Sequence, residues 1–222
     1  SLSKNSKSHQ GKDKKHKKSS KDKEHKKSDK EEKTNRKELT FSPQPGKNFD
    51  GIMRYLTNKT GGNIHDNQTV EITSNSISGN SHPKNLVNYN NDTRYQCLMN
   101  GRGDAYICFD FKDMRIQLSN YTIQSNNCIG KNWYDLRNWV IEVSDDGQKW
   151  NEIDRHTDDP ALNGQNIIHT FKVQKPNDGF HRYVRLRQTG KTWSQPSDPY
   201  HFFFSFLEFY GKIEIPDKKF KM

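Results

Sequence analysis

Residues 105–111 read AYICFDF and residues 114–118 read MRIQL, and these two runs decide the fold class. In both runs every second residue is apolar: Ile107, Phe109 and Phe111, then Met114, Ile116 and Leu118. Because successive side chains of a strand point to opposite faces, this alternation predicts two strands that each bury one face. The apolar residues of YTI (121–123) are shifted in phase by one position, which predicts a β-bulge or the start of a new strand.

Similar short runs recur along the chain. They are GIMRYL (51–56), QTVEIT (68–73), NWVIEV (138–143), IIHTFKV (167–173), YVRLR (183–187) and FFFSFLEFYG (202–211). In the last run Phe203, Leu207 and Phe209 are expected in the core. SDDGQKW (144–150) is predicted to be a hairpin, with Asp146-Gly147 in its turn. No amphipathic run of helix length is found, so the pattern predicts an antiparallel all-β sandwich or barrel.

Charge is concentrated at the start of the chain. Residues 1–40 hold 15 Lys plus Arg and 7 Asp plus Glu, whereas the whole chain holds 37 and 27. With almost no apolar residue, this stretch cannot offset the entropy of ordering, so residues 1–45 are predicted to be a disordered Lys/Ser-rich tail and hinge. We expect the tail to give weak, non-specific contact with polyanions. The near-neutral remainder argues against a folded domain that reads nucleic acid.

The three cysteines, Cys97, Cys108 and Cys128, form neither a complete disulfide framework nor a zinc-binding pattern. Buried free thiols are therefore expected, which favours an intracellular protein, cytoplasmic with the nucleus possible. No run is long and apolar enough for a transmembrane segment, and no signal peptide is visible.

Several stretches together resemble the discoidin-like family, also called the coagulation factor V/VIII type C domain. They are HPKNLVNYNNDTRYQC (82–97), YICFDFKDMRI (106–116), WVIEVSDDGQKWNEID (139–154), RYVRLRQTGKTW (182–193) and FSFLEFYGKI (204–213). Their order is similar to that of the family, above all to its cysteine-poor protist variants. The resemblance implies a galactose-binding-like jelly-roll β-sandwich of about eight strands at residues 46–213, followed by a short basic tail at 214–222.

The resemblance also implies a binding module and not an enzyme, with ligands held by loops at one end of the sandwich. A glycan, a phospholipid headgroup and a protein partner all remain open as ligands, because fold does not fix function. Sugar-binding members often hold a calcium ion, and the matching positions here are Asn88, Asp92, Thr93 and Glu208. Asn88 replaces the usual aspartate and removes a charge, so we expect loop-capping hydrogen bonds there and predict no metal and no cofactor.

Two loops combine aromatic and basic residues. They are NNCIGKNWYDLRN (126–138) and TGKTWSQPSDPYH (189–201). The residues predicted to bind ligand are Trp133, Tyr134, Lys191, Trp193, Tyr200 and His201, with Arg187 on the preceding strand. Such residues suit contact with a sugar, a peptide or a membrane interface. The alternatives are that Trp133 and Trp193 fold back as lids over the core, and that Arg187 belongs to a solvated or salt-bridged sheet face.

No catalytic set is predicted, because the histidines are scattered and no nucleophile motif is present. Two alternative functions are kept: a polyanion- or nucleic-acid-associated protein that acts through its Lys-rich tail, and an enzyme of unknown class. Arg102-Gly103-Asp104 matches a known adhesion tripeptide but directly precedes a predicted strand. We interpret it as a sharp turn.

Overall fold

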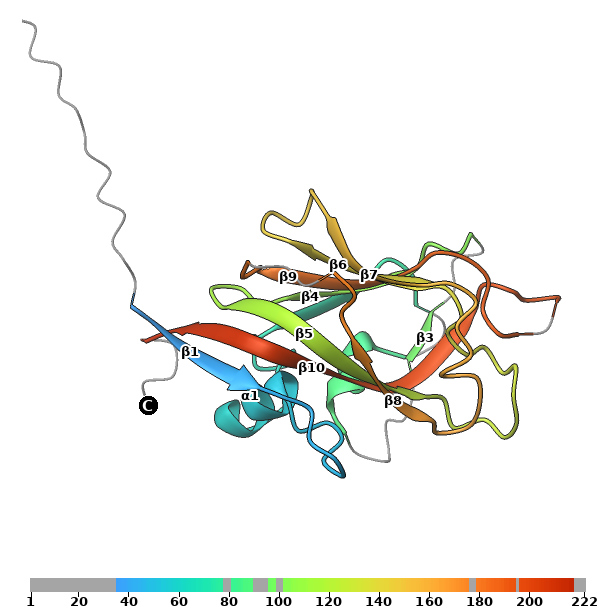
Figure 1. Cartoon of the computed structure of the whole chain (residues 1–222), viewed down its shortest axis with the longest axis horizontal. Helices are drawn as coiled ribbons and strands as arrows, with labels where there is room; N and C mark the ends of the chain where they lie inside the picture. Colours follow the sequence, from blue (N-terminus) through green and yellow to red (C-terminus); the bar gives the residue numbers. More distant parts are fainter. Residues whose placement is uncertain are drawn as a thin grey trace, which may run out of the picture. The chain divides into compact units, whose positions relative to one another are not determined.

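The computed structural model describes residues 35–77, 81–89, 96–98, 102–175, 179–194 and 196–217. In these residues two antiparallel five-stranded sheets pack face to face as a sandwich (Figure 1). One sheet has the order β1 (Arg36–Phe41), β10 (Phe202–Pro216), β5 (Arg115–Ser125) and β8 (Ile168–Lys172), with β3 (Gln96–Leu98) also paired to β10. The other has the order β2 (Glu71–Ser74), β4 (Tyr106–Asp110), β9 (Tyr183–Gln188), β6 (Trp139–Ser144) and β7 (Asn151–His156). The predicted all-β sandwich is confirmed.

The alternating runs supply the core as expected. Ile107, Phe109 and Phe111 on one run, and Met114, Ile116 and Leu118 on the next, are all buried. The phase shift before YTI corresponds to a bulge, because the pairing of β5 with β10 passes from Asn120–Tyr210 directly to Leu118–Gly211. The hairpin between β6 and β7 is also confirmed, with Gly147 at a positive φ of 71°.

The prediction of a strand at residues 51–56 is wrong, because the structure has helix α1 at Ile52–Thr60. Ile52, Met53 and Leu56 bury one side of the helix. Gly61 ends it in the left-handed conformation, and its N–H donates to Thr57 O at 3.0 Å. A short 3₁₀ helix, η1 (Pro83–Val87), follows β2.

Both predicted boundaries of the sandwich are also wrong. Strand β1 begins at Arg36, ahead of the predicted start at residue 46, and it pairs with β10 from Arg36–Pro216 to Phe41–Gly211. The strand β10 accordingly runs past residue 213 to Pro216, into the predicted C-terminal tail. Backbone hydrogen bonds to the end of β10 hold the mostly polar segment RKELTF as a strand, and hydrophobicity does not report such bonds. The predicted disorder of residues 1–34 lies outside the described residues.

In β10 the apolar phase differs from the prediction at one position. Phe202 and Phe204 are buried, whereas Phe203 is only half-buried. The pairing with β5 shifts between Phe204 and Phe206, and this irregularity returns Leu207 and Phe209 to the core.

Free thiols are present as predicted at Cys108 and Cys128, both half-buried. Burial raises the pKa of the Cys108 thiol to about 12, so this thiol stays protonated and unreactive at neutral pH. The side chain of Cys97 lies outside the described residues. In the described part of the chain, no helix is long and apolar enough to cross a membrane.

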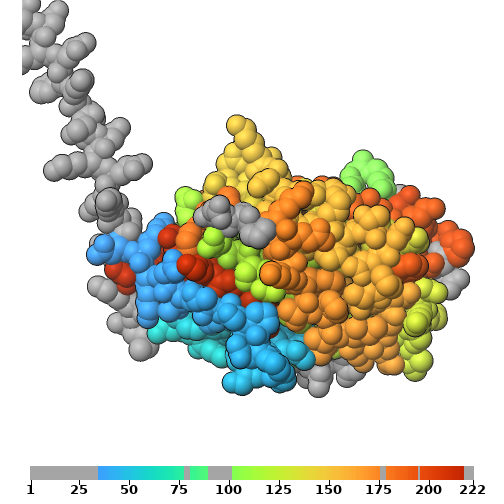
Figure 2. All heavy atoms as spheres, in the orientation of Figure 1, coloured from blue at the N-terminus to red at the C-terminus, as the bar shows by residue number. Residues whose placement is uncertain are grey.

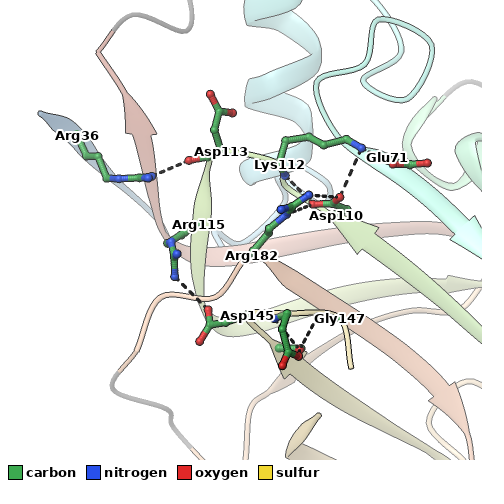
Figure 3. Close-up of polar contacts among 11 residues, drawn as sticks. Arg36, Glu71, Asp110, Lys112, Asp113, Arg115, Asp145, Gly147 and Arg182 are labelled. Carbon is green, nitrogen blue, oxygen red and sulfur yellow. Dashed lines mark hydrogen bonds and ion pairs between the residues drawn. The ribbon is translucent and has the colours of Figure 1, made fainter. Parts of the chain in front are cut away.

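Ion pairs bind the strands together at the end of the sandwich that holds the β4–β5 turn (Figure 3). Arg182, which directly precedes β9, donates Nε and Nη2 to the carboxylate of Asp110 at 2.7 and 2.8 Å. Lys112 in the turn pairs with Asp110 at 3.4 Å and with Glu71 of β2. Arg36 of β1 donates to Asp113 O at 2.7 Å. The first strand is thus fixed beside this turn.

Candidate functional site

The two loops predicted to bind ligand lie at the other end of the sandwich, away from β1 and the end of β10. Figure 2 shows the yellow-green atoms of the β5–β6 connection near the orange-red atoms of the β9–β10 connection. A pair of backbone hydrogen bonds joins them, from Asp135 N to Trp193 O at 3.2 Å and from Trp193 N to Asp135 O at 2.9 Å. The structure therefore brings residues 126–138 and 189–194 together.

Two large apolar side chains stand exposed in the first loop. Ile129 is 82% exposed and Trp133 is 47% exposed. The loop reverses at Gly130, whose φ is 99°, and the Trp133 indole packs over this glycine. Lys131 is exposed between them. Trp133 was predicted as a contact residue, whereas Ile129 was missed because a single aliphatic residue in a polar loop carries no motif.

Asparagine side chains fix the conformation of this loop through hydrogen bonds. The Nδ2 of Asn126 donates to Trp133 O and to Asp135 Oδ1, both at 2.7 Å. Asn132 and Asn163 exchange two hydrogen bonds, with the Asn132 N–H donating at 2.8 Å and the Asn163 Nδ2 donating at 3.1 Å. The tip residues are therefore presented on a fixed loop, which lowers the entropy cost of binding.

Asp135 is completely buried beneath the loop. Burial raises the pKa of its carboxyl to about 7, although backbone N–H groups of Trp133 and Gly164 act in the opposite direction. Burial therefore favours the protonated form of the Asp135 carboxyl well above the pH at which an exposed aspartate ionises.

Trp193 differs from Trp133, because its side chain is half-buried and contacts other loops of the domain. Its Nε1–H donates to Asp159 O at 2.8 Å, and the Arg137 guanidinium lies over the ring at 4.3 Å from its centre. The lid interpretation therefore describes Trp193 well and does not describe Trp133.

The remaining predicted residues of the second loop have structural contacts of their own. Lys191 is exposed, and its carbonyl accepts from Asn138 Nδ2 at 2.7 Å. Tyr134 and His201 pack edge to face at 5.7 Å between ring centres. The carbonyl of Tyr200 accepts from Gln188 Nε2 at 3.1 Å. Of these residues, Lys191 is the one that offers a free, exposed charge beside the first loop.

Arg187 does not belong to this cluster. It lies on β9, where it donates Nε and Nη2 to the carboxylate of Glu142 on β6 at 3.0 and 2.8 Å. Alternation along β9 turns Arg187 to the outer face of the sheet, which matches the alternative of a salt-bridged sheet face.

The Arg102-Gly103-Asp104 tripeptide forms the predicted turn. Gly103 is buried with φ of 79°, and a Cβ at this position would lie 2.7 Å from the ring of Tyr200. Only glycine fits such a position without strain. Arg102 and Asp104 pair with each other at 3.7 Å. The tripeptide is thus packed against the second loop.

Glu208, the predicted calcium-matching carboxylate, caps helix α1. Its Oε1 accepts from Met53 N and Phe209 N, both at 2.8 Å, and its Oε2 accepts from Arg54 N and Tyr89 Oη, both at 3.0 Å. Burial raises the pKa of this carboxyl to about 7 in spite of these donors. Both oxygens are therefore occupied by hydrogen bonds, as the capping expectation required.

Of the other calcium-matching positions, Asn88 alone lies among the described residues. The Oδ1 of Asn88 accepts from Asn63 Nδ2, while Asp92 and Thr93 lie outside the described residues. Among the residues that the structure describes, no three His, Cys, Asp or Glu side chains gather as metal ligands do.

One buried polar network was missed in the sequence. His156 lies between Asp159 Oδ2, 2.6 Å from its Nδ1, and Asp154 Oδ2, 2.9 Å from its Nε2. Its ring stacks on Trp139 at 4.2 Å, and Tyr121 Oη donates to Asp154 at 2.6 Å. Burial would lower the pKa of His156, but the two carboxylates raise it above its ordinary value. This network links β7 to the loop that holds Trp193.

Comparison with known proteins identifies the family of the domain. Residues 71–200 match the family model of the F5/8 type C domain. Two curated relatives are the E3 ubiquitin-protein ligases Ufd4 of Drosophila melanogaster, 27% identical over 95 residues, and hecd-1 of Caenorhabditis elegans, 28% identical over 95 residues. These matches cover 42% and 43% of this chain but only 3% of each ligase.

Similar solved structures are small modules. One is the family 32 CBM of NanJ from Clostridium perfringens in complex with galactose, with a TM-score of 0.48, 11% identity, and coverage of 64% of this chain and 94% of that chain. Another is the C-terminal domain of a chitobiase from Bacteroides fragilis, with a TM-score of 0.49, 16% identity, and coverage of 64% and 93%. The family model spans more than half of the chain, and the chain therefore belongs to the F5/8 type C domain family.

Proposed function

We propose that the chain is a recognition module that binds a protein partner through its end-loop surface, which consists of Ile129, Lys131, Trp133 and Lys191. The F5/8 type C domain is a binding module and not a catalytic domain. One observation carries the proposal. Among the described residues only four large apolar side chains are markedly exposed, and two of them, Ile129 and Trp133, share one loop.

The composition of the end-loop surface favours a protein over the other ligands. An aliphatic side chain beside a tryptophan gives a compact apolar contact, which is typical of the centre of a protein interface. Sugar recognition relies on several polar groups that converge around an aromatic face. The ligases that match in sequence are enzymes that modify proteins, and the matching segment occupies a small part of each. A protein-binding role is consistent with that setting.

The test uses the full chain with a photo-crosslinking amino acid in place of Ile129. Proteins captured from lysate are identified and purified. The affinity of each purified protein is then measured for the wild-type chain and for the Trp133→Ala and Ile129→Ser variants. Burial of either side chain contributes about 1.5 kcal/mol or more, so we expect each substitution to weaken binding about tenfold. Ile168→Ser is the matched control, because Ile168 is 40% exposed but lies on β8.

Parallel arms measure binding to a glycan array and to phosphatidylserine vesicles. The proposal is wrong if Trp133→Ala weakens binding to a sugar or to vesicles but does not weaken binding to any purified protein. It is also abandoned if Ile168→Ser weakens the captured partner as much as Ile129→Ser.

A further inference from the structure

The outer face of the second sheet carries a compact group of arginines and aromatic rings. Strand pairing places Arg185 beside Cys108 and Glu142, and Arg187 beside Tyr106 and Val140. Trp150, which directly precedes β7, lies against the guanidinium of Arg185. We call Tyr106, Glu142, Trp150, Arg185 and Arg187 the arginine platform. It lies on a sheet face and not in the loops that form the end-loop surface.

One carboxylate fixes both guanidinium groups of the platform. Arg185 donates its Nε to Glu142 Oε2 at 2.8 Å, and its Nη2 lies 2.7 Å from the same oxygen. Arg187 donates Nε to Oε2 at 3.0 Å and Nη2 to Oε1 at 2.8 Å. The Glu142 side chain is only 8% exposed. The arginines are therefore held in one orientation and remain partly accessible, at 15% for Arg185 and 29% for Arg187.

Aromatic rings enclose the first of these arginines. The guanidinium carbon of Arg185 lies 3.8 Å from the centre of the Trp150 ring and 5.1 Å from that of Tyr106. Stacking of this kind orders a long side chain before any ligand arrives. Tryptophan, tyrosine and arginine are also the residues that contribute most binding energy at protein interfaces.

The platform has an excess of positive charge and unused donors. Two guanidinium groups share the single carboxylate of Glu142, so one positive charge is not neutralised. A guanidinium has five N–H donors, and the hydrogen bonds to Glu142 involve only Nε and Nη2. Within the described residues, no hydrogen bond is seen from Nη1 of either arginine. A ligand carboxylate can accept from these groups without breaking the pairs with Glu142.

We propose that the arginine platform docks an acidic peptide segment of a protein partner, with a carboxylate of that segment on Arg187 and an apolar side chain of it against Trp150. The local charges favour a short acidic segment over a membrane or a nucleic acid. Asp145 and Asp146 are exposed at the tip of the adjoining β6–β7 hairpin. With Asp145 paired to Arg115 and Asp146 beside Lys149, this hairpin adds no net positive charge for an extended anionic surface, so a peptide with few charges matches the platform better.

The experiment titrates isotope-labelled full chain with a short blocked peptide of alternating Glu and Tyr. The four tryptophan indole signals report on separate places, namely Trp150 for the platform, Trp133 and Trp193 for the end loops, and Trp139 for the core. Residues 1–34 contain neither Trp nor Arg, so the tryptophan and arginine side-chain signals exclude that segment. We expect shifts at the Trp150 indole and at the Nε–H of Arg185 and Arg187.

Substitutions then measure the contribution of the platform. Loss of a charge-assisted hydrogen bond predicts about tenfold weaker peptide binding for Arg187→Ala and an intermediate loss for Arg187→Lys. Arg115→Ala is the matched control, because Arg115 is 43% exposed and pairs with Asp145 away from the platform. Its affinity should change by less than about twofold. Trp150→Ala provides a second variant in case Arg187→Ala unfolds.

Three results would overturn the proposal. The first is a shift that is confined to the Trp133 or Trp193 indole, or no shift at all. The second is equal binding of a twin peptide in which Lys replaces Glu. The third is stronger movement of the Trp150 signal by duplex DNA or phosphatidylserine vesicles than by the peptide. None of these results depends on whether a partner binds the end-loop surface.

Discussion

Replacement of Glu208 by glutamine tests how a distant strand stabilises helix α1. The substitution keeps the size of the side chain but turns one acceptor oxygen into a donor. If the remaining oxygen stays with Met53 and Phe209, the new NH₂ group faces the N–H of Arg54 and the hydroxyl of Tyr89. The hydroxyl can accept, whereas the Arg54 N–H is left buried without an acceptor. Such a group costs about 1–3 kcal/mol.

The penalty should depend on pH in a defined direction. The pKa of Glu208 is raised from 4.5 to about 7, so the folded state keeps a proton that the unfolded state has released. Proton binding at Glu208 therefore contributes fully to the free energy of unfolding below about pH 4.5, and this contribution is lost as the pH rises toward 7. At 1.36 kcal/mol for each unit, the wild type loses about 2–3 kcal/mol between pH 5 and pH 8. Glutamine does not titrate, so the penalty of Glu208→Gln should shrink by that amount.

Urea unfolding followed by tryptophan fluorescence at pH 5, 6, 7 and 8 measures this difference. Asp135 also titrates, but it is present in both proteins and cancels in the comparison. Glu214→Gln on the same strand controls for the chemical change at a half-buried site. A penalty that grows with pH, or that does not change, would refute the reasoning. It would mean that Glu208 acts as a permanent charge at the helix N-terminus.

Four further predictions follow from the same contacts. Trp193→Ala should lower the free energy of unfolding in urea by about 3 kcal/mol, because packing and an indole hydrogen bond are lost. Trp133→Ala should lower it by less than about 1 kcal/mol, because Trp133 is 47% exposed. Equal losses would contradict the lid interpretation of Trp193. Gly103→Ala should destabilise by about 2 kcal/mol or more because of the positive φ and the nearby Tyr200 ring, and a neutral result would speak against the buried turn. The pKa of His156 is raised, so its contribution to the free energy of unfolding should be complete below about pH 6.5 and disappear as the pH rises above that value. His156→Gln should remove this part of the pH dependence of unfolding. An unchanged pH dependence would exclude the His156 network as its source. Removal of residues 1–34 should abolish most binding to random duplex DNA at low salt while the melting temperature stays the same, and retained binding would assign the attraction to the folded domain.

Local alternation was sufficient to predict most of the sandwich. The runs at 105–123 and 138–143 have strong period-two patterns because one face of each strand is buried, and even the bulge near Ser119 left a phase shift in the sequence. Strand β1 left a weaker trace, since four of its six side chains are exposed and the bonds to β10 come from the backbone. The sequence pattern predicted a strand where α1 lies, and the N–H of Met53 in this helix donates to Glu208, which is 155 residues away. No local pattern reports a contact of that range.

The candidate site could be predicted only in part for related reasons. Aromatic and basic composition singled out the loop that exposes Trp133, and its role in binding stays a prediction. Composition could not separate Trp133 from Trp193, because the difference lies in the partners Asp159 and Arg137, which come from other loops. Arg187 was predicted to bind ligand together with the loops because it directly precedes the second loop in the sequence. The pleat of β9 instead turns its side chain toward Glu142.

The pairing of β1 with the end of β10 has a mechanical consequence. Arg36 lies opposite Pro216, so the chain enters and leaves the domain at neighbouring points. A tension applied through flanking polypeptide would strain the hydrogen bonds of this pair in sequence, as in the opening of a zipper, and not all at once. The first strand would peel away at low force while the remaining sandwich, with its loops at the far end, stays assembled. Detachment would uncover the outer edge of β10 and make it available to another strand.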